Sequence, residues 1–513
     1  MTIDNETSEG LDSAVDNGDN GDATGASRQW RSAWRVHFYA GIFSMPFIVL
    51  MAVTGLVILY TQPIQDWMQD DLRKVEVGTS QVSYEDQVRS VEARYPKSTV
   101  ISMTTPSSKD RAVTFGLDEG SVHSAGSEVF VNPYTGKVLG INENGAGIVG
   151  LANRLHGYLN VDGVTVKLPT IAALWDDEPV MREYVVFDLV LEIFGVWALV
   201  LLTSGLFIWW PRRSRKSDEP NKKRSILGVR RGTKGRARLR DLHGLSGALL
   251  SVMLLVTVVS GMAWSAYWST NFASFAEEVT PGNVIEPPLS ALGTRSDLDR
   301  IGNKINWNTG DFPIPASYVT KSDGSLPAPM RLNAIVDIAK REGMKPGYSV
   351  YFPANEAAED GTMTYGAFTV SNSWPRKTSE ARDLFIDQFS GKTLAEQKVY
   401  GSGAISVGMD TLVSTHMGTQ LGWFSRILMT ALCILAIWSV TSASMMFWKR
   451  RRPGTLGLPR RPMNVRLSKQ LIGIAVLFGI IFPQWGVSAL VVLAFDRFVI
   501  RRVRPLRIAF GQR

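Results

Sequence analysis

The sequence contains only five histidines among 513 residues, and four of them adjoin long apolar segments. These four are His37 in "WRVHFYAG", His156 in "NRLHGYL", His243 in "RDLHGLSG" and His416 in "VSTHMGT". An imidazole can ligate haem iron or another transition metal, and it can also cap a helix or lie at a membrane interface. For a single histidine the capping or interfacial role is the simpler interpretation. The arrangement of the four histidines must therefore decide between metal ligation and a capping or interfacial role.

The segments beside these histidines are almost wholly apolar and predict membrane-spanning helices. Four of them contain enough residues, at 1.5 Å each, to cross a hydrocarbon core of about 30 Å; they are residues 42–60, 184–210, 248–267 and 423–448. Two shorter segments, 471–482 and 486–495, flank "FPQWG" and predict a helical hairpin. We therefore expect an α-helical integral membrane protein with about six spans.

Basic residues follow the second, fourth and sixth apolar segments, as in "PRRSRKSDEPNKKR", "WKRRRPG" and "RFVIRRVRPLR". Short loops rich in Lys and Arg stay in the cytoplasm, so both termini are expected there. The same residues can attract anionic membrane lipid, and their position beside the spans argues against a nucleic-acid partner. The acidic, glycine-rich residues 1–29 predict a disordered tail rather than a signal peptide.

An internal repeat relates the two halves of the chain. In "HFYAGIFSMPFIVLMAVTG" and "HGLSGALLSVMLLVTVVSG", a glycine follows the histidine by four positions and a hydroxyl-Gly pair ends the segment. The ends "TSGLFIWWPRR" and "TSASMMFWKRRR" also align, as do "EVFVNPYTGKVLG" and "DLFIDQFSGKTLAE" in the intervening loops. The sequence thus predicts a tandem two-span repeat, with an external α+β module in each half.

We expect the following division: a cytoplasmic tail (1–29), span 1 (30–62), a first external module and connector (63–182), span 2 (183–211), a basic loop (212–241), span 3 (242–268), a second external module and connector (269–421), span 4 (422–448), and a basic loop, hairpin and basic tail (449–513).

The repeat places His37 with His243 near the cytoplasmic face and His156 with His416 near the external face. A bis-imidazole haem suits such a pair, because iron takes one axial nitrogen on each side of a flat macrocycle. Zinc suits it less, because each pair lacks the usual third or fourth ligand nearby. The fifth histidine, His123, has no counterpart and is most simply a surface residue.

Glycines lie one helical turn after two of the histidines. Gly41 follows His37 and Gly247 follows His243 by four residues, which places each glycine on the same helix face as its histidine. Without a side chain at these positions, a porphyrin could lie against the backbone.

From about residue 30 to 510 the chain resembles the PepSY-associated transmembrane proteins of bacterial inner membranes, which include iron-uptake proteins and haem-containing ferric-siderophore reductases. The most specific motifs are "WRVHFYAG", "EVFVNPYTGKVLG", "SGLFIWWPRR", "RLRDLHGLSG" and "FPQWGVSAL". The resemblance implies PepSY modules in the external loops and two b-type haems whose iron ligands are His37, His156, His243 and His416. It further implies electron transfer across the membrane to a ferric complex such as a ferric siderophore. In the second half, "SASMMFWKRR" departs from the glycine-containing motif.

Two acidic residues, Asp188 and Glu192, lie four positions apart on one face of the second span. Carboxylates within a bilayer are candidates for function, here for proton delivery or for contact with a haem-coordinating group. The repeat aligns Asp188 with Arg426, so an ion pair between them is the structural alternative. Glu192 aligns with Thr430, which carries no charge, and is the better functional candidate.

The sequence gives little support for nucleotide binding. "GAGIVG" from Gly145 matches a dinucleotide-binding pattern, but it lies in an external loop without the rest of a βαβ unit. The electron donor is therefore expected to be a separate protein or a diffusible carrier. The single cysteine, Cys433, most simply contributes to packing within its span.

The sequence is also compatible with two other classes of protein. A membrane-anchored PepSY protein could bind a peptide or regulate a peptidase without catalysing a reaction, and parallel repeats with intramembrane carboxylates also suit a transporter. A low-spin b-type spectrum of the purified protein would favour the reductase over both.

Topology can be tested with reporters that are active on one side of the membrane. Because of the basic loops, we expect fusions after Arg224 to report the cytoplasm and fusions after Gly136 or Gly391 to report the outside. An external signal at Arg224 would exchange the faces assigned to the two histidine pairs.

Overall fold

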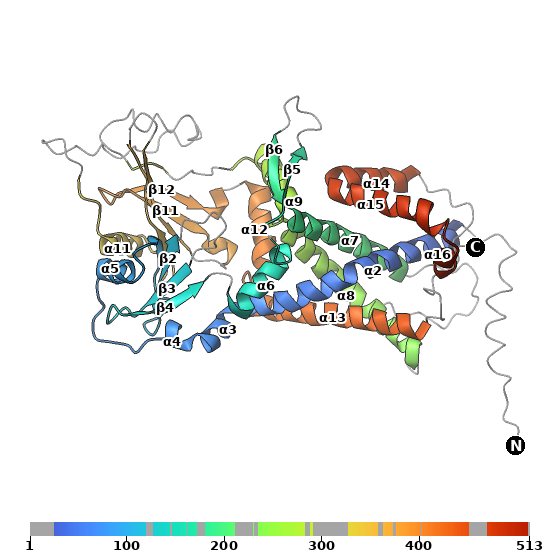
Figure 1. Cartoon of the computed structure of the whole chain (residues 1–513), viewed down its shortest axis with the longest axis horizontal. Helices are drawn as coiled ribbons and strands as arrows, with labels where there is room; N and C mark the ends of the chain where they lie inside the picture. Colours follow the sequence, from blue (N-terminus) through green and yellow to red (C-terminus); the bar gives the residue numbers. More distant parts are fainter. Residues whose placement is uncertain are drawn as a thin grey trace, which may run out of the picture. The chain divides into compact units, whose positions relative to one another are not determined.

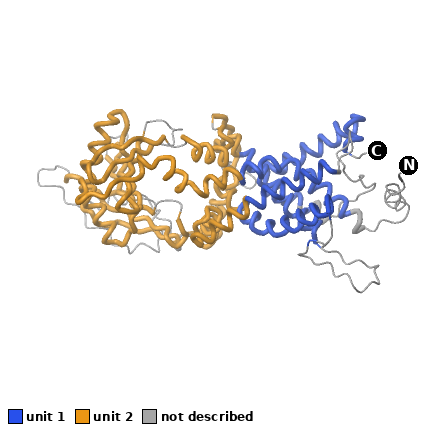
Figure 2. The backbone as a smooth tube through the Cα atoms, turned by 90° about the horizontal axis from the view of Figure 1, so that it is seen from below, with its two compact units in different colours: residues 1–52, 189–258, 434–513 blue, residues 53–188, 259–433 orange. Residues whose placement is uncertain are grey.

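The computed structural model describes residues 25–118, 127–143, 146–161, 163–171, 180–210, 229, 234–282, 288–290, 327–357, 363–372, 376–401, 403–450 and 469–510. Most of the expected acidic tail and basic loop, and also His123, lie outside these residues. The chain divides into two compact units, coloured separately in Figure 2. Unit 1 contains residues 1–52, 189–258 and 434–513, and unit 2 contains residues 53–188 and 259–433.

Within the described part, five helical segments are long and apolar enough to cross a membrane. Four of them belong to α2 (Gly25–Leu59), α7 (Val186–Trp209), α8 (Gly235–Met262) and α13 (Trp423–Arg450); the fifth runs from Pro483 to Ile500 through α15 (Pro483–Phe495) and a π-helical turn. Large apolar side chains point outward from them, as shown by Val252 and Leu490, which are 65% and 67% exposed. Such helices are suited to a lipid environment, so the chain is a membrane protein.

The C-terminal hairpin forms as expected, but the number of spans is lower than expected. Helix α14 (Lys469–Ile481) has 13 residues, which cover about 20 Å and fall short of the bilayer core. The prediction of about six spans is therefore corrected to five helices of sufficient length in the described residues. Where α14 and α15 meet, a Cβ on Gly486 would lie 3.2 Å from the Cα of Gly479, so the close approach favours glycine.

Unit 2 is built around an antiparallel sheet of eight strands in the order β12-β11-β10-β7-β1-β2-β3-β4. Figure 1 labels β2, β3, β4, β11 and β12 of this sheet. The segment between α2 and α7 supplies β1 (Thr99–Thr104), β2 (Val113–Asp118), β3 (Ser127–Val131) and β4 (Val138–Glu143). The segment between α8 and α13 supplies β7 (Ser349–Tyr351), β10 (Phe368–Ser371), β11 (Arg382–Ile386) and β12 (Thr393–Lys398). Both expected α+β segments thus contribute to one sheet.

Strands β1 and β7 join the two segments at the centre of the sheet. Met103 pairs with Val350, and the flanking residue Thr104 pairs with Ser349. Helices α5 (Tyr84–Arg94) and α11 (Leu332–Arg341) lie beside each other (Figure 1). Their first turns exchange hydrogen bonds: the Tyr84 amide donates to Asn333 Oδ1 at 2.9 Å, and the Asn333 amide donates to Glu85 Oε1 at 3.0 Å.

Matching turns follow β3 and β11, where the sequence reads "NPYTG" and "DQFSG". In each, the first side chain accepts hydrogen bonds from two backbone amides of the turn: Asn132 Oδ1 at 2.9 and 3.3 Å, Asp387 Oδ1 at 2.8 and 2.7 Å. Each turn ends at a glycine with positive φ, +68° at Gly136 and +69° at Gly391, which a residue with a Cβ adopts only under strain.

Unit 2 also contains shorter helices, two hairpins and two 3-10 turns. They comprise α3 (Thr61–Met68), α4 (Asp70–Arg73), α6 (Gly147–Tyr158), α9 (Ala266–Val279), α12 (Ala404–His416), the hairpins β5–β6 (Thr165–Pro169, Met181–Val185) and β8–β9 (Asn355–Ala357, Met363–Tyr365), and two 3-10 turns (Thr378–Glu380, Val399–Gly401). In unit 1, α16 (Arg504–Ala509) follows the hairpin.

An ion pair ties α3 to the segment before β2. Asp66 accepts hydrogen bonds from the Arg111 guanidinium at 2.7 and 2.9 Å and from Arg73 Nε at 3.0 Å. The hydrogen bond from Arg111 is the main reason that the pKa of the Asp66 carboxyl lies below its usual value.

One apolar core lies between the sheet and its two helices. It includes Val91 from α5 and Phe115 from β2 together with Ile335 from α11 and Ile386 from β11, all of them fully buried. Because residues from both segments fill the same core, we expect the two segments to unfold together.

This expectation can be tested with Ile335→Ala, which removes buried methyl groups from α11 and should destabilise the sheet by about 2–5 kcal/mol. Hydrogen exchange on the whole protein should then show similar losses of protection at Val113 and Val370, which lie in different segments. The control is Ile101→Ala, because Ile101 is 45% exposed on β1 and its loss should change stability little. Loss of protection confined to β7 and β10–β12 would mean that the segments unfold separately.

Candidate functional site

The structure brings four of the five histidines together in two pairs. In unit 1, the ring centroids of His37 on α2 and His243 on α8 are 6.5 Å apart, with an interplanar angle of 68°. In unit 2, the ring centroids of His156 on α6 and His416 on α12 are 6.3 Å apart, with an angle of 69°. These are the pairs that the sequence repeat predicts.

In the unit 1 pair, hydrogen bonds to a backbone carbonyl determine the tautomers. His37 Nδ1 lies 3.0 Å from the Leu201 carbonyl oxygen on α7, and His243 Nδ1 lies 3.1 Å from the Ser439 carbonyl oxygen on α13. A carbonyl oxygen can only accept, so Nδ1 carries the hydrogen in both rings. The lone pair then lies on Nε2, the nitrogen through which such an imidazole would ligate a metal.

In the unit 2 pair, a hydroxyl group contacts the equivalent nitrogen. His156 Nδ1 lies 2.8 Å from Thr54 Oγ1 on α2, and His416 Nδ1 lies 3.0 Å from Ser260 Oγ on α8. A hydroxyl can donate or accept, so this contact is compatible with a hydrogen on Nδ1 and ligation through Nε2.

Each histidine also contacts a dipeptide of one hydroxyl residue and one small residue on another helix. The four dipeptides are Ser204-Gly205 for His37, Ser442-Ala443 for His243, Thr54-Gly55 for His156 and Ser260-Gly261 for His416. The hydroxyl-Gly pair was visible in the sequence as part of the repeat. Its role was not, because the histidine that it contacts lies on a different segment of the chain.

Glycine in these dipeptides lets the imidazole approach the helix backbone. A Cβ at Gly205 would lie 2.9 Å from His37 Cε1, closer than side chains tolerate, and a Cβ at Gly261 would lie 3.3 Å from His416 Cε1. A Cβ at Gly55 would lie at an ordinary 3.5 Å from His156 Cε1. The ring of His37 therefore depends most on the absence of a side chain beside it.

The separation of the rings fits one metal ion between two imidazoles. An imidazole nitrogen binds a transition metal at about 2.0 Å and lies roughly 1.1 Å from its ring centre, so two rings on opposite sides of one ion have centroids about 6.2 Å apart. The observed separations are 6.5 and 6.3 Å. Among the described residues, no group of three or more His, Cys, Asp or Glu could hold a metal ion.

The two glycines predicted to face a porphyrin have few neighbours. Among the described atoms, a Cβ added at Gly247 would meet nothing within 4 Å, and one added at Gly41 would meet only Leu201 Cδ1, at 3.5 Å. Both positions are therefore compatible with a flat group lying against the helix, as the sequence analysis predicts.

A comparison with known protein families identifies the family of this chain. Residues 34–450 match the family model for the PepSY-associated TM region, a range that includes all four paired histidines. The chain belongs to this family. A search among curated proteins gives no match.

In this PepSY-associated protein the two acidic candidates of α7 have different surroundings. Asp188 is half-buried in the first turn of the helix, where a negative charge is favourable. Glu192 is only 3% exposed, and its Oε2 accepts a hydrogen bond of 2.8 Å from Gln484 Nε2, in the first turn of α15. Thr430, which the repeat aligns with Glu192, lies 3.0 Å from the Tyr60 hydroxyl. The sequence did not predict that Glu192 would contact the C-terminal hairpin.

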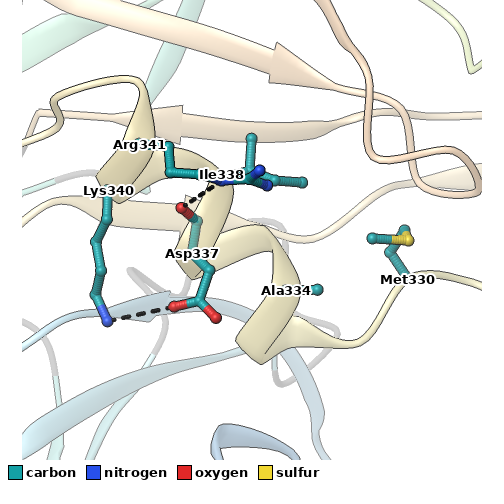
Figure 3. Close-up of a pocket in the computed structure, with 6 residues that line it drawn as sticks. All are labelled: Met330, Ala334, Asp337, Ile338, Lys340 and Arg341. Atoms are coloured by element: carbon teal, nitrogen blue, oxygen red, sulfur yellow. Dashed lines mark hydrogen bonds and ion pairs between the residues drawn. The ribbon is translucent and has the colours of Figure 1, made fainter.

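A shallow depression beside α11 is a weaker candidate (Figure 3). It is lined by Met330, Ala334, Asp337, Ile338, Lys340 and Arg341. Its charged groups bond within one helix, as in the 3.6 Å ion pair between Lys340 and Asp337. Such pairs are typical of a solvated helix surface, and the depression contains none of the paired histidines.

The contact between Glu192 and Gln484 predicts a double-mutant result. Gln484→Leu should lower the thermal stability of the detergent-solubilised protein by about 1–3 kcal/mol, because the buried carboxylate loses a donor. The double variant Glu192→Leu with Gln484→Leu should recover part of that loss, since neither polar group is then buried. Additive losses would mean that the hydrogen bond does not couple the hairpin to α7.

Proposed function

We propose that the protein is a haem-containing reductase of the bacterial inner membrane that transfers electrons across the membrane to a ferric complex, such as a ferric siderophore, during iron uptake. The observation that carries the proposal is the presence of two separate imidazole pairs at the spacing of a shared metal ion. A single such pair could be incidental, but two pairs with equivalent helix contacts are difficult to attribute to capping.

The residues present fit haem b at both sites. His37 with His243 would hold one haem and His156 with His416 the other, each through Nε2. With two imidazoles as ligands, the bound haem would supply one-electron chemistry rather than a position for binding substrate. The chain contributes by fixing the Nδ1 hydrogen, and hence the direction of each Nε2, through contacts with the neighbouring helices.

The contacts of the two halves support the proposed two-span repeat. From His37 to His243 the offset is 206 positions, as it is from Thr54 to Ser260. The carbonyl acceptors, Leu201 and Ser439, are offset by 238 positions, as are the hydroxyls at Ser204 and Ser442. Equivalent helices therefore make equivalent contacts, and the matching turns after β3 and β11 support a PepSY-like module in each half.

The proposed direction of transfer follows from the predicted topology. The topology expected from the basic loops would put His37 and His243 on the cytoplasmic side, where a separate protein or a diffusible carrier would supply electrons. It would put His156 and His416 on the external side, where each ferric ion of the substrate would take up one electron and become ferrous. Asp188 and Glu192 remain candidates for proton delivery to groups near the haems.

The pairing of the ligands can be tested by measuring haem per protein as the pyridine haemochrome. We expect His37→Ala to remove one haem, or to leave its iron five-coordinate, while the other keeps its six-coordinate spectrum. His37→Ala with His243→Ala should lose little more haem than one substitution, because two ligands of one iron act as a unit. His37→Ala with His156→Ala should affect both haems.

The fifth histidine provides the matched control, since His123→Ala should leave the haem content unchanged. If the His37/His243 double variant loses both haems, the ligands are paired differently from our proposal. Colourless protein from haem-replete cells would instead favour a membrane-anchored peptide-binding or peptidase-regulating protein, or a transporter.

A further inference from the structure

The two histidine pairs differ in the chemical nature of the group that contacts Nδ1. In the unit 1 pair, amide carbonyl oxygens of Leu201 and Ser439 accept from His37 and His243 at 3.0 and 3.1 Å. In the unit 2 pair, the contacts are with hydroxyl groups at 2.8 and 3.0 Å. The distances are nearly the same, so the charge on the acceptor decides which contact polarises the imidazole more.

An amide oxygen carries more negative charge than an aliphatic hydroxyl oxygen and is the stronger acceptor. Donation from Nδ1–H raises the electron density on Nε2 and makes the imidazole a more basic ligand. A more basic axial ligand stabilises ferric iron relative to ferrous iron, which lowers the reduction potential. In the unit 1 pair, the hydroxyls of Ser204 and Ser442 lie 3.3 Å from the same nitrogens and act in the same direction.

On the basis of the proposed haem ligation, we infer that the His37–His243 site has a lower reduction potential than the His156–His416 site. A haem held by His37 and His243 would then be the stronger one-electron donor, and a haem held by His156 and His416 would be the acceptor of that electron. The transfer requires no proton. The hydrogen bonds of the histidines thus favour electron flow toward the substrate side.

Basic residues near the unit 1 pair act in the opposite direction. Arg35 lies two positions before His37 on α2 and is buried, and its guanidinium donates to the Tyr39 hydroxyl and the Phe510 carbonyl oxygen rather than to either imidazole. The arginines before His243 would stabilise ferrous iron and raise the potential of this site. Arg240 is 59% exposed at its side chain and lies 3.5 Å from the Asp241 carboxylate, so solvent and a counter-charge screen it. Direct hydrogen bonds to the ligands should therefore have the larger effect.

Potentiometric titration of the purified, haem-loaded full chain, followed by visible absorption, tests this inference. We expect two reduction waves. The wave at lower potential should be lost in His37→Ala, and the wave at higher potential should be lost in His156→Ala. A single wave for two haems, or the opposite assignment, would overturn the inference and leave the proposed ligation intact.

Variants of the hydroxyl groups test the cause of the difference. Thr54→Val removes the acceptor from His156 with little change in shape, so the higher wave should shift to still higher potential while the lower wave stays in place. Ser260→Ala should act in the same way through His416. Ser204→Ala is the matched control, because His37 keeps its carbonyl acceptor and the lower wave should shift less.

An unchanged higher wave in both Thr54→Val and Ser260→Ala would show that the hydroxyls do not set the potential and would overturn the inference. Absence of haem from the unmodified protein would overturn the proposed function as well, so failure of the function and failure of the inference can be told apart.

Discussion

The structure depends on a contact between the Nδ1 side of an imidazole and a hydroxyl residue on a neighbouring helix, with a small residue beside it. The contact occurs four times, and Thr54, Ser260 and Ser442 are buried at three of them. An imidazole can rotate about its side-chain bonds, and a fixed Nδ1 removes that freedom. The opposite nitrogen of each ring then has a defined direction, which a pair of axial ligands requires.

The same contact also holds helices together where the hydrophobic effect provides little help. Apolar side chains on membrane helices are as well solvated by lipid as by other helices, so association relies on close packing and hydrogen bonds. The four histidine contacts connect α2 with α7 and α8 with α13 in unit 1, and α2 with α6 and α8 with α12 in unit 2. The proposed haem ligands therefore also take part in helix packing, and a change at Gly205 is expected to disturb both.

Local patterns in the sequence predicted the features that are encoded locally. Apolar length identified α2, α7, α8 and α13, and "FPQWG" identified the hairpin of α14 and α15. The duplicated spacing of His37 and His243 predicted their pairing, because a repeat places equivalent residues at equivalent positions. The segment 471–482 was counted as a span although it is short, and α14 with its 13 residues does not reach across the bilayer core.

Features that depend on residues far apart in the chain were harder to predict from the sequence. Nothing near Met103 indicates that it pairs with Val350, almost 250 positions away, so the two α+β segments were not expected to form one sheet. Glu192 was recognised as unusual from its charge in an apolar helix, but its contact with Gln484 depends on how the hairpin folds back. The hydroxyl-Gly pairs were seen as a repeated motif, whereas their function became evident only with the histidines beside them.

Each half of the chain supplies four strands of the sheet and one histidine of each pair. A polypeptide that ended after α7 would leave β1 as an open edge with unpaired backbone groups, and it would hold a solitary imidazole at each site. Such a fragment could satisfy its edge and its ligands only by meeting a second fragment of the same kind. The chain is in this sense comparable to a dimer whose two halves are covalently joined, so that they cannot exchange or dissociate.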